Sequence, residues 1–323
     1  MVFACCMAGP YHLDCGIPCQ DAFAVQQGAG SIVCAAVADG LGSERFSDAG
    51  AQTAAQTAVA FCAAQLQPEM EPAAAQAVLQ AAFSEAWAAV AARAAQEGNP
   101  LGEYDSTLCL AAYDGERLVF GQSGDSGLVA LLESGDYVLV TDQQRDEEGN
   151  VFPLCFGPEK WVFGCVEAPV SGLMLLTDGL LAQICPPLLR GREIEINVPL
   201  ARRFLDRFDC PEEDVPALEA AAKAYLAGFP RAAIDDDKTF VVCLNPQRPP
   251  KEKPADYYSA PDWDALRRET EEKLFHSSAP ASAPETPPPS APENAGPSRL
   301  DRLRALCARL RAECTGKKGE SAT

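Results

Sequence analysis

The sequence predicts an α+β fold in which antiparallel β-sheets are covered by helices. Short apolar runs of strand length, separated by Gly, Asp and Asn, indicate many strands. Two blocks of helical sequence interrupt these runs instead of alternating with them one by one. This order does not fit a regular βαβ array and favours layered sheets with helices packed outside. A chain of 323 residues is long enough for one large domain and a tail.

The first predicted elements are a buried strand and two long helices. Residues 31–38 form an apolar run that predicts a strand ending at Asp39. Residues 47–66 and 72–96 are rich in Ala, with Val, Leu, Phe and Trp spaced along them. This composition predicts two helices, which prolines separate.

The rest of the domain is predicted to be mostly β-structure. Further strands are expected at 107–113, 116–123, 126–133, 136–141, 161–167 and 171–177. Two more helices are expected at 199–209 and 213–228, and a last strand at 239–244.

Composition and charge exclude several classes of function. The formal net charge is −20, which repels the phosphates of nucleic acids and anionic membranes. No run approaches the roughly 18 apolar residues of a transmembrane helix, and the start lacks the basic segment of a signal peptide. The 14 cysteines are scattered through apolar segments, which favours reduced thiols in the cytoplasm. The adjacent Cys5 and Cys6 are interpreted as part of an early strand, with lipidation as the alternative.

Four aspartates follow or precede apolar strands in distant parts of the chain. They are Asp21, Asp39, Asp178 and Asp236. A single Asp-Gly pair is usually a turn, but several carboxylates at strand ends can form an oxygen-rich pocket. Such a pocket suits Mg²⁺ or Mn²⁺.

Five short segments carry these residues in a recognisable order. They are Gln20-Asp21-Ala22-Phe23, Ala38-Asp39-Gly40-Leu41-Gly42, Gly124-Asp125-Ser126, Thr177-Asp178-Gly179 and Asp236-Asp237-Lys238-Thr239. In this order the chain resembles the metal-dependent protein phosphatases of the type 2C (PPM-type) family, in particular its compact bacterial members, over roughly residues 8–245. The resemblance implies a four-layer α-β-β-α sandwich with two central antiparallel sheets and a metal site at one edge.

The resemblance also implies a metal-dependent serine/threonine protein phosphatase. Two Mn²⁺ or Mg²⁺ ions would hold a bridging hydroxide that attacks phosphorus in line. Asp39 would bridge both ions and the Gly40 carbonyl would add a ligand. Asp21 would serve one ion, and Asp178 and Asp236 the other. The substrate would be a phosphoprotein, the target of a serine/threonine kinase.

Two further positions depend on the resemblance. In the family the counterpart of Asp125 approaches a third, weaker metal, although a plain hairpin would explain this residue equally. Aligning Lys238-Thr239 with the family pattern places a metal ligand at Asp236. Asp237 then replaces the usual Asn and adds a negative charge beside the site.

Two departures from the family concern protons and phosphate. Leu41 stands where many members carry a His that acts as general acid, and leucine cannot donate a proton. Residues 8–20 contain no phosphate-binding Arg, and His12 is either a phosphate contact or a structural hydrogen-bond partner. These departures leave a catalytically weak or inactive binding or sensing module as the alternative function.

The phosphatase domain is expected to span residues 1–245, followed by a tail. Residues 246–297 form a linker rich in Pro, Ala and Ser, with a short helix at 262–275. Residues 298–314 predict an amphipathic helix with leucines on one face, a candidate for partner docking, and 315–323 a disordered end.

Overall fold

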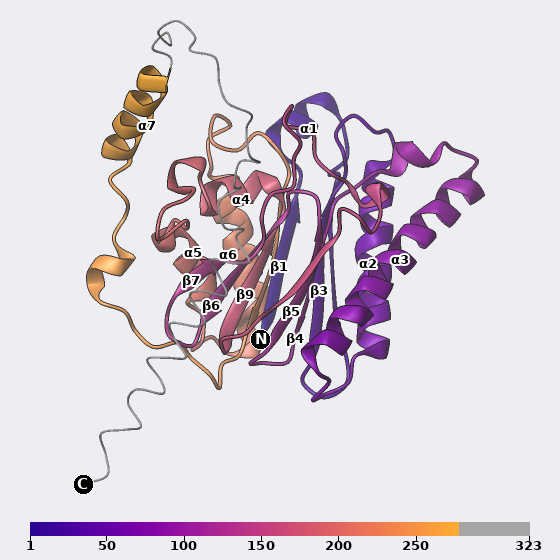
Figure 1. Ribbon diagram of the computed structural model, residues 1–323, viewed down its shortest axis with the longest axis horizontal. Helices are drawn as coiled ribbons and strands as arrows, with labels where there is room; N and C mark the ends of the chain where they lie inside the picture. Colours follow the sequence, from indigo (N-terminus) through magenta and orange to yellow (C-terminus); the bar gives the residue numbers. More distant parts are fainter. Residues whose placement is uncertain (278–323) are drawn as a thin grey trace, which may run out of the picture.

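Two five-stranded antiparallel sheets lie face to face in the computed structural model, which describes residues 1–277 (Figure 1). The first sheet has the order β1 (Val2–Met7), β10 (Lys238–Leu244), β9 (Val170–Leu176), β6 (Gly127–Leu132), β7 (Tyr137–Leu139). The second has the order β2 (Asp21–Gln27), β3 (Val33–Asp39), β4 (Leu108–Tyr113), β5 (Leu118–Ser123), β8 (Val162–Val166). Every ladder is antiparallel.

Helices cover the outer face of each sheet. The second sheet packs against α2 (Ser47–Gln65) and α3 (Pro72–Glu97), and the first against α4 (Asp178–Ile184), α5 (Val198–Leu205) and α6 (Val215–Ala227). The remaining helices are α1 (Pro10–Cys15) and α7 (Trp263–Ser277), with short 3₁₀ turns at Leu101–Tyr104, Leu154–Phe156, Pro187–Leu189, Glu212–Asp214 and Ala255–Tyr258. The predicted α-β-β-α sandwich is confirmed.

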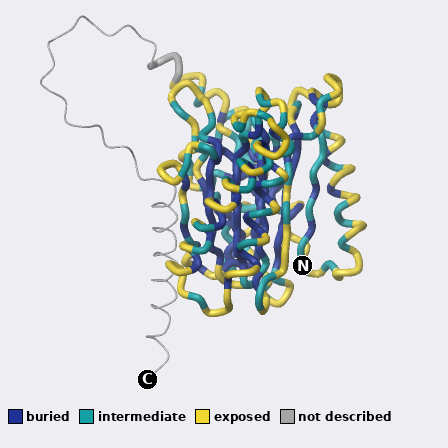
Figure 2. Tube along the Cα trace, turned by 90° about the vertical axis from the view of Figure 1, so that its right-hand side faces the viewer, coloured by how far each residue is buried: buried dark blue, intermediate teal, exposed yellow. Residues whose placement is uncertain are grey.

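The core has three layers because the central strands bury both of their faces. Residues such as Val37, Leu128 and Leu175 fill the space between the sheets, and two further apolar layers lie under the helices. Figure 2 shows the buried strands inside a more exposed shell of helices and loops. The Ala-rich face of α2 allows close approach: a Cβ on Gly50 would lie 1.9 Å from the Tyr104 carbonyl oxygen. The three apolar layers therefore pack the two sheets and the helices closely against one another.

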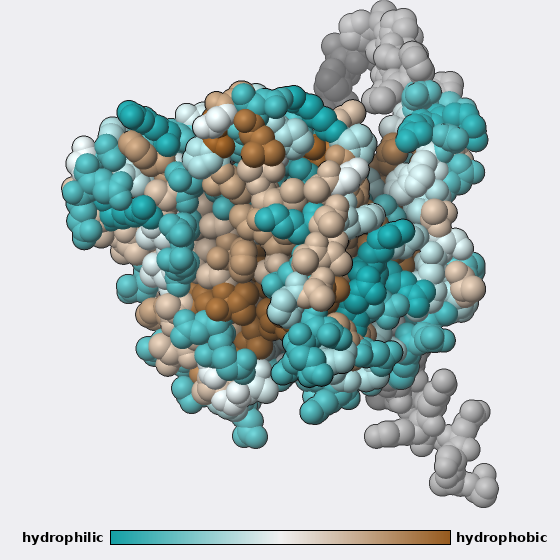
Figure 3. Space-filling model, turned by 180° about the vertical axis from the view of Figure 1, so that it is seen from behind, coloured by the Kyte–Doolittle hydropathy of each residue, from teal (hydrophilic) through white to brown (hydrophobic). Residues whose placement is uncertain are grey.

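The edge strand β2 leaves part of its inner face, the side that it shares with Ala35 and Val37, in contact with solvent. Phe23 and Val25 are among the exposed large apolar side chains. Figure 3 shows, from behind, apolar surface gathered toward the middle of a face with hydrophilic margins. Among the described helices, none is both long and apolar enough to cross a membrane.

The described part of the tail packs against the first sheet. The Lys251 N–H donates to the Glu133 carbonyl at 2.8 Å, and the Tyr137 N–H donates to the Tyr257 hydroxyl at 2.9 Å. Arg248 forms ion pairs with Glu116 and Glu133. The expected helix at 262–275 is present as α7. The predicted 298–314 helix and 315–323 end lie outside the described residues.

These contacts predict that a chain ending at Asn245 is less stable than one ending at Ser277. The shorter chain loses the cover over β7, and each 1 kcal/mol lost lowers the melting temperature by about 2–4 °C in a domain of this size. Thermal unfolding of the two truncated chains checks this expectation. Equal melting temperatures would show that residues 246–277 add nothing to the folded domain.

Candidate metal centre

Three aspartates at or just beyond the ends of different strands meet at one edge of the two sheets. Oxygens of Asp39, Asp125 and Asp178 all lie within 4.8 Å of one another. Asp39 ends β3, Asp125 lies in the turn between β5 and β6, and Asp178 begins α4 just after β9. The turn depends on Gly124, whose φ of 101° favours glycine. Antiparallel strands thus bring residues that are far apart in sequence to the same edge.

A cavity of about 200 Å³ opens at this cluster. Its lining includes the three aspartates together with His12, Gly40, Leu41, Arg145 and Asp236. The size suits a small ionic group more than a large apolar ligand.

The consecutive aspartates before β10 have three different surroundings. Asp235 forms an ion pair with Arg231 on the surface. Asp236 lines the cavity, and one of its carboxylate oxygens accepts the N–H of Asp237 at 2.8 Å. Asp237 is 3% exposed and points into the protein. Side-chain alternation along an extended segment therefore leaves Asp236 as the member that faces the site.

Asp21 lies beside Asp39 but outside the cavity lining. The two residues are opposite each other in the β2–β3 ladder. The Asp21 carboxylate is 7% exposed and accepts a hydrogen bond from the Thr177 hydroxyl at 2.7 Å. Asp21 is thus a direct neighbour of the aspartate cluster, and its contact with a metal stays a prediction.

Crowded carboxylates shift one another's protonation. Burial, followed by the charges of Asp21, Asp178, Asp125 and Asp236, raises the pKa of Asp39 well above its usual value. Burial and the charge of Asp178 raise the pKa of Asp125 to about 6, although Arg145 opposes the shift. The pKa of Asp236 is raised mainly by burial and by Asp178. Burial is the largest cause of each shift, and the repulsion between neighbouring carboxylates adds to it; a bound cation would relieve both effects.

The segment after Asp39 approaches the neighbouring helix very closely. A Cβ on Gly40 would lie 2.7 Å from the Ser47 backbone at the start of α2, so only glycine fits. The next residue, Leu41, lines the cavity. The aliphatic side chain of Leu41 thus lies where many members of the resembled family carry a His that acts as general acid.

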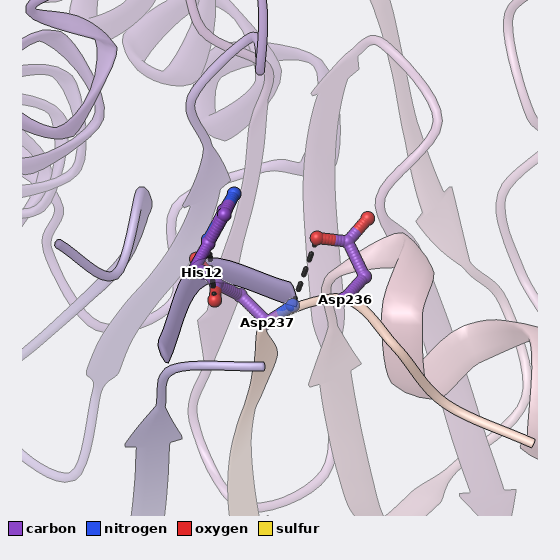
Figure 4. Close-up of side chains that lie close together, drawn as sticks. All are labelled: His12, Asp236 and Asp237. Atoms are coloured by element: carbon purple, nitrogen blue, oxygen red, sulfur yellow. Dashed lines mark hydrogen bonds and ion pairs between the residues drawn. The ribbon is translucent and has the colours of Figure 1, made fainter. Parts of the chain in front are cut away.

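His12 and Asp237 form a buried pair at the side of the cavity (Figure 4). The His12 Nδ1 lies 2.7 Å from Asp237 Oδ1. Asp237 also accepts the backbone N–H groups of Gly9 at 2.7 Å and Gln20 at 2.6 Å. His12 therefore makes the structural hydrogen bond that was one of its two expected roles. Its second ring nitrogen points away from Asp237, and His12 also lines the cavity.

Arg145 is the functional candidate that sequence reasoning missed. Its guanidinium bonds to Asp125 and, at 3.1 Å, to Oδ2 of Asp178. The loop that carries it is attached to the Asp125 turn, because the Gln144 side chain accepts the Gly124 N–H at 2.8 Å. The sequence signal, a lone Arg in an acidic loop, is weak.

The donor set fits a hard divalent cation. Asp125 Oδ1 is buried and has no hydrogen-bond partner among the described residues. The lining near it offers carboxylates and the Gly40 backbone, the oxygen ligands that Mg²⁺ and Mn²⁺ prefer. One guanidinium balances only part of the charge of Asp39, Asp125, Asp178 and Asp236. The cluster is therefore suited to further positive charge.

Three solved structures share this fold at low sequence identity. A bacterial serine phosphatase is 13% identical, covers 78% of this chain and 99% of its own, and has a TM-score of 0.51. The Mycobacterium tuberculosis serine/threonine phosphatase PstP/Ppp is 20% identical, with coverages of 75% and 97% and a TM-score of 0.51. The catalytic domain of PstP in complex with two manganese ions is 20% identical, with coverages of 75% and 96% and a TM-score of 0.50. These likenesses show the fold.

The family follows from the sequence match. No curated protein sequence matches this chain. The family model described as protein phosphatase 2C matches residues 8–223, which is most of the domain described above. The chain therefore belongs to the protein phosphatase 2C family, a family of phosphoprotein phosphatases.

Proposed function

We propose that this protein is a metal-dependent serine/threonine phosphatase whose metal centre is the aspartate cluster. The observation that carries the proposal is the meeting of Asp39, Asp125 and Asp178 within 4.8 Å, with a buried Asp125 oxygen left without a partner. An oxygen-rich cavity of this kind in a family of phosphatases is best explained by divalent ions.

Asp39 would hold both of two ions, with the Gly40 carbonyl as a further ligand. Asp178 and Asp236 would complete the site, Asp21 would act on one ion from beneath, and Asp125 would serve a third, weaker position. When bound, Mn²⁺ or Mg²⁺ would neutralise phosphoryl oxygens and supply hydroxide near neutral pH for in-line attack on phosphorus. The manganese ions of the PstP domain support this choice of metal.

Two side chains that can donate hydrogen bonds, Arg145 and His12, line the cavity and are candidates to bind the substrate phosphate. Arg145 contacts Asp125 and Asp178, so its guanidinium lies within reach of an anion held at the same cluster. Asp237 fixes the His12 ring through Nδ1, which leaves the second nitrogen for the phosphate. We propose that this pair replaces the Arg that residues 8–20 lack.

The inactive binding module is not favoured. Leu41 lines the cavity and provides no general acid there. However, the acidic residues of the candidate centre face the cavity together, and a module without chemistry would not need to keep them so crowded. The physiological substrate is a phosphoprotein; a cognate kinase, docking through residues 298–314 and a cytoplasmic location stay predictions.

The direct test is hydrolysis of p-nitrophenyl phosphate by the full chain. We expect turnover with Mn²⁺, loss of turnover with excess EDTA, and recovery when Mn²⁺ is restored. A fresh preparation that binds Mn²⁺ in calorimetry but hydrolyses neither this ester nor a phosphothreonine peptide would favour the binding module instead.

Replacement of Arg145 tests the phosphate site. Arg145→Ala is expected to raise the KM for p-nitrophenyl phosphate by roughly 10- to 100-fold, because a hydrogen bond to a charged group contributes about 1.5–3 kcal/mol. Arg145→Lys should lie between the two, since it keeps the charge but loses the forked geometry. Arg117→Ala, which removes an exposed Arg paired with Asp114, is the matched control. An unchanged KM in Arg145→Ala would exclude this residue from substrate binding.

A further inference from the structure

Two cysteines lie in contact at the two ends of the segment 7–18, which contains α1 and His12. The Cys6 and Cys19 Sγ atoms are 3.5 Å apart, and both side chains are half-buried. Each thiol also lies near the Asp21 carbonyl oxygen, at 3.5 Å from Cys6 and 3.9 Å from Cys19. The shared acceptor holds the two sulfurs side by side on neighbouring segments.

The geometry permits a covalent bond with little movement. A disulfide has an S–S length of about 2.05 Å, so the sulfurs need to approach by only about 1.5 Å. Cys6 is near the end of β1, whereas Cys19 lies in the loop just before β2. The loop residue can therefore move toward the strand without breaking a ladder.

The ring that this bond would close contains the side wall of the site. Residues 7–18 include Gly9 and His12, two of the three groups that bind Asp237. The third, the Gln20 N–H, belongs to the residue directly after Cys19. In the β1–β10 ladder Cys6 lies opposite Thr239, two residues beyond Asp237. A bond between the sulfurs would therefore move the groups that hydrogen-bond to Asp237, and it would also pull on the strand that pairs with β10 just after Asp237.

We propose that Cys6 and Cys19 are a site of reversible oxidation to a disulfide by hydrogen peroxide, and that the bond lowers turnover by displacing the segment 7–18, which carries His12. The sulfur of one cysteine, as thiolate, attacks a peroxide oxygen; the O–O bond breaks, water leaves after protonation, and a sulfenic acid forms. The second sulfur attacks the sulfenic sulfur, the S–O bond breaks and a second water leaves. The two thiols lose two electrons and the peroxide gains them. A dithiol reverses the change by thiol–disulfide exchange.

The effect on turnover rests on the proposed function, whereas the disulfide does not. Cys19 is joined to Gln20, whose N–H donates to Asp237 at 2.6 Å, and Asp237 holds His12. A shift of the order of 1 Å in such a group is enough to reduce turnover by about tenfold or more.

The experiment treats the reduced full chain with hydrogen peroxide, removes the peroxide with catalase and blocks the remaining thiols. Peptide mass spectrometry without reduction then identifies cross-links, and hydrolysis of p-nitrophenyl phosphate with Mn²⁺ is measured before oxidation, after it, and after dithiothreitol. Cys6→Ser and Cys19→Ser remove the pair, and Cys15→Ser, which replaces an exposed cysteine at the end of α1 in the same segment, is the matched control.

We expect a cross-link between residues 6 and 19 and a loss of turnover that dithiothreitol restores, in the wild type and in Cys15→Ser but in neither pair variant. Absence of the cross-link overturns the proposal, as does a cross-linked enzyme with unchanged turnover or an equal loss in Cys6→Ser. If the reduced protein hydrolyses nothing, the proposed function fails, while the mass spectrum still decides whether the disulfide forms.

Discussion

Asp39→Asn is expected to lower Mn²⁺-dependent turnover by at least about 10³-fold, because several kcal/mol of transition-state stabilisation depend on the bound metal. Asp39 is central among the acidic residues: the charges of Asp21, Asp125, Asp178 and Asp236 all raise its pKa in addition to burial. An amide keeps the shape of this side chain but removes the negative charge that two ions would share. Steady-state hydrolysis of p-nitrophenyl phosphate measures the loss.

The same variant is expected to be at least as stable as the wild type without metal. The pKa of Asp39 is higher in the folded than in the unfolded chain, so the native state binds more protons above about pH 4. Its unfolding free energy therefore falls as pH rises through the window between the ordinary and the raised pKa. Asn does not titrate and avoids this penalty, which thermal unfolding at pH 8 in EDTA detects. Asp264→Asn on the exposed face of α7 is the control for a surface replacement. If Asp39→Asn keeps most of the wild-type turnover, the two-metal centre is refuted.

Asp236→Asn is expected to lose turnover by roughly 10²-fold or more, whereas Asp235→Asn stays near the wild type. Asp236 faces the cavity, but Asp235 pairs with Arg231 on the surface, where an ion pair contributes about 0–1 kcal/mol. The comparison of adjacent residues controls for backbone effects. When activity is titrated with Mn²⁺, the concentration that gives half-maximal activity should rise in Asp236→Asn and stay unchanged in Asp235→Asn. Equal losses, or a larger loss in Asp235→Asn, would place the ligand one residue earlier.

The fold was predictable because its main elements have strong local patterns. The predicted strand 31–38 and helix 47–66 correspond to β3 and α2. Uninterrupted apolar sequence marks a strand buried on both faces, and Ala-rich sequence favours a helix that packs closely. The pattern missed β2, an edge strand that mixes apolar with exposed polar residues such as Gln26 and Gln27, and α1, which has only six residues. Weakly buried and short elements lack the periodicity that prediction needs.

The candidate site was predictable where a strand end carries a carboxylate. Asp39, Asp178 and Asp236 line the cavity, as strand-end residues were expected to do, whereas Asp21 at the start of β2 does not. Arg145 was not predictable, because a long loop brings it to Asp125 and no local pattern records that path. The threefold hydrogen bonding of Asp237 likewise depends on contacts with residues near the start of the chain.

The pairing of β1 with β10 has a consequence for how the chain acquires its structure. Cys6 lies opposite Thr239, so the earliest strand finds its partner only after almost the whole domain has been synthesised. Contacts of such large sequence separation close slowly, and nascent chains that wait for them expose unpaired strand edges. The strand that arrives last is also the one preceded by Asp236. A ribosome-bound chain that stops short of β10 therefore lacks a complete first sheet, and we expect the proposed metal centre to become complete only after β10 has paired.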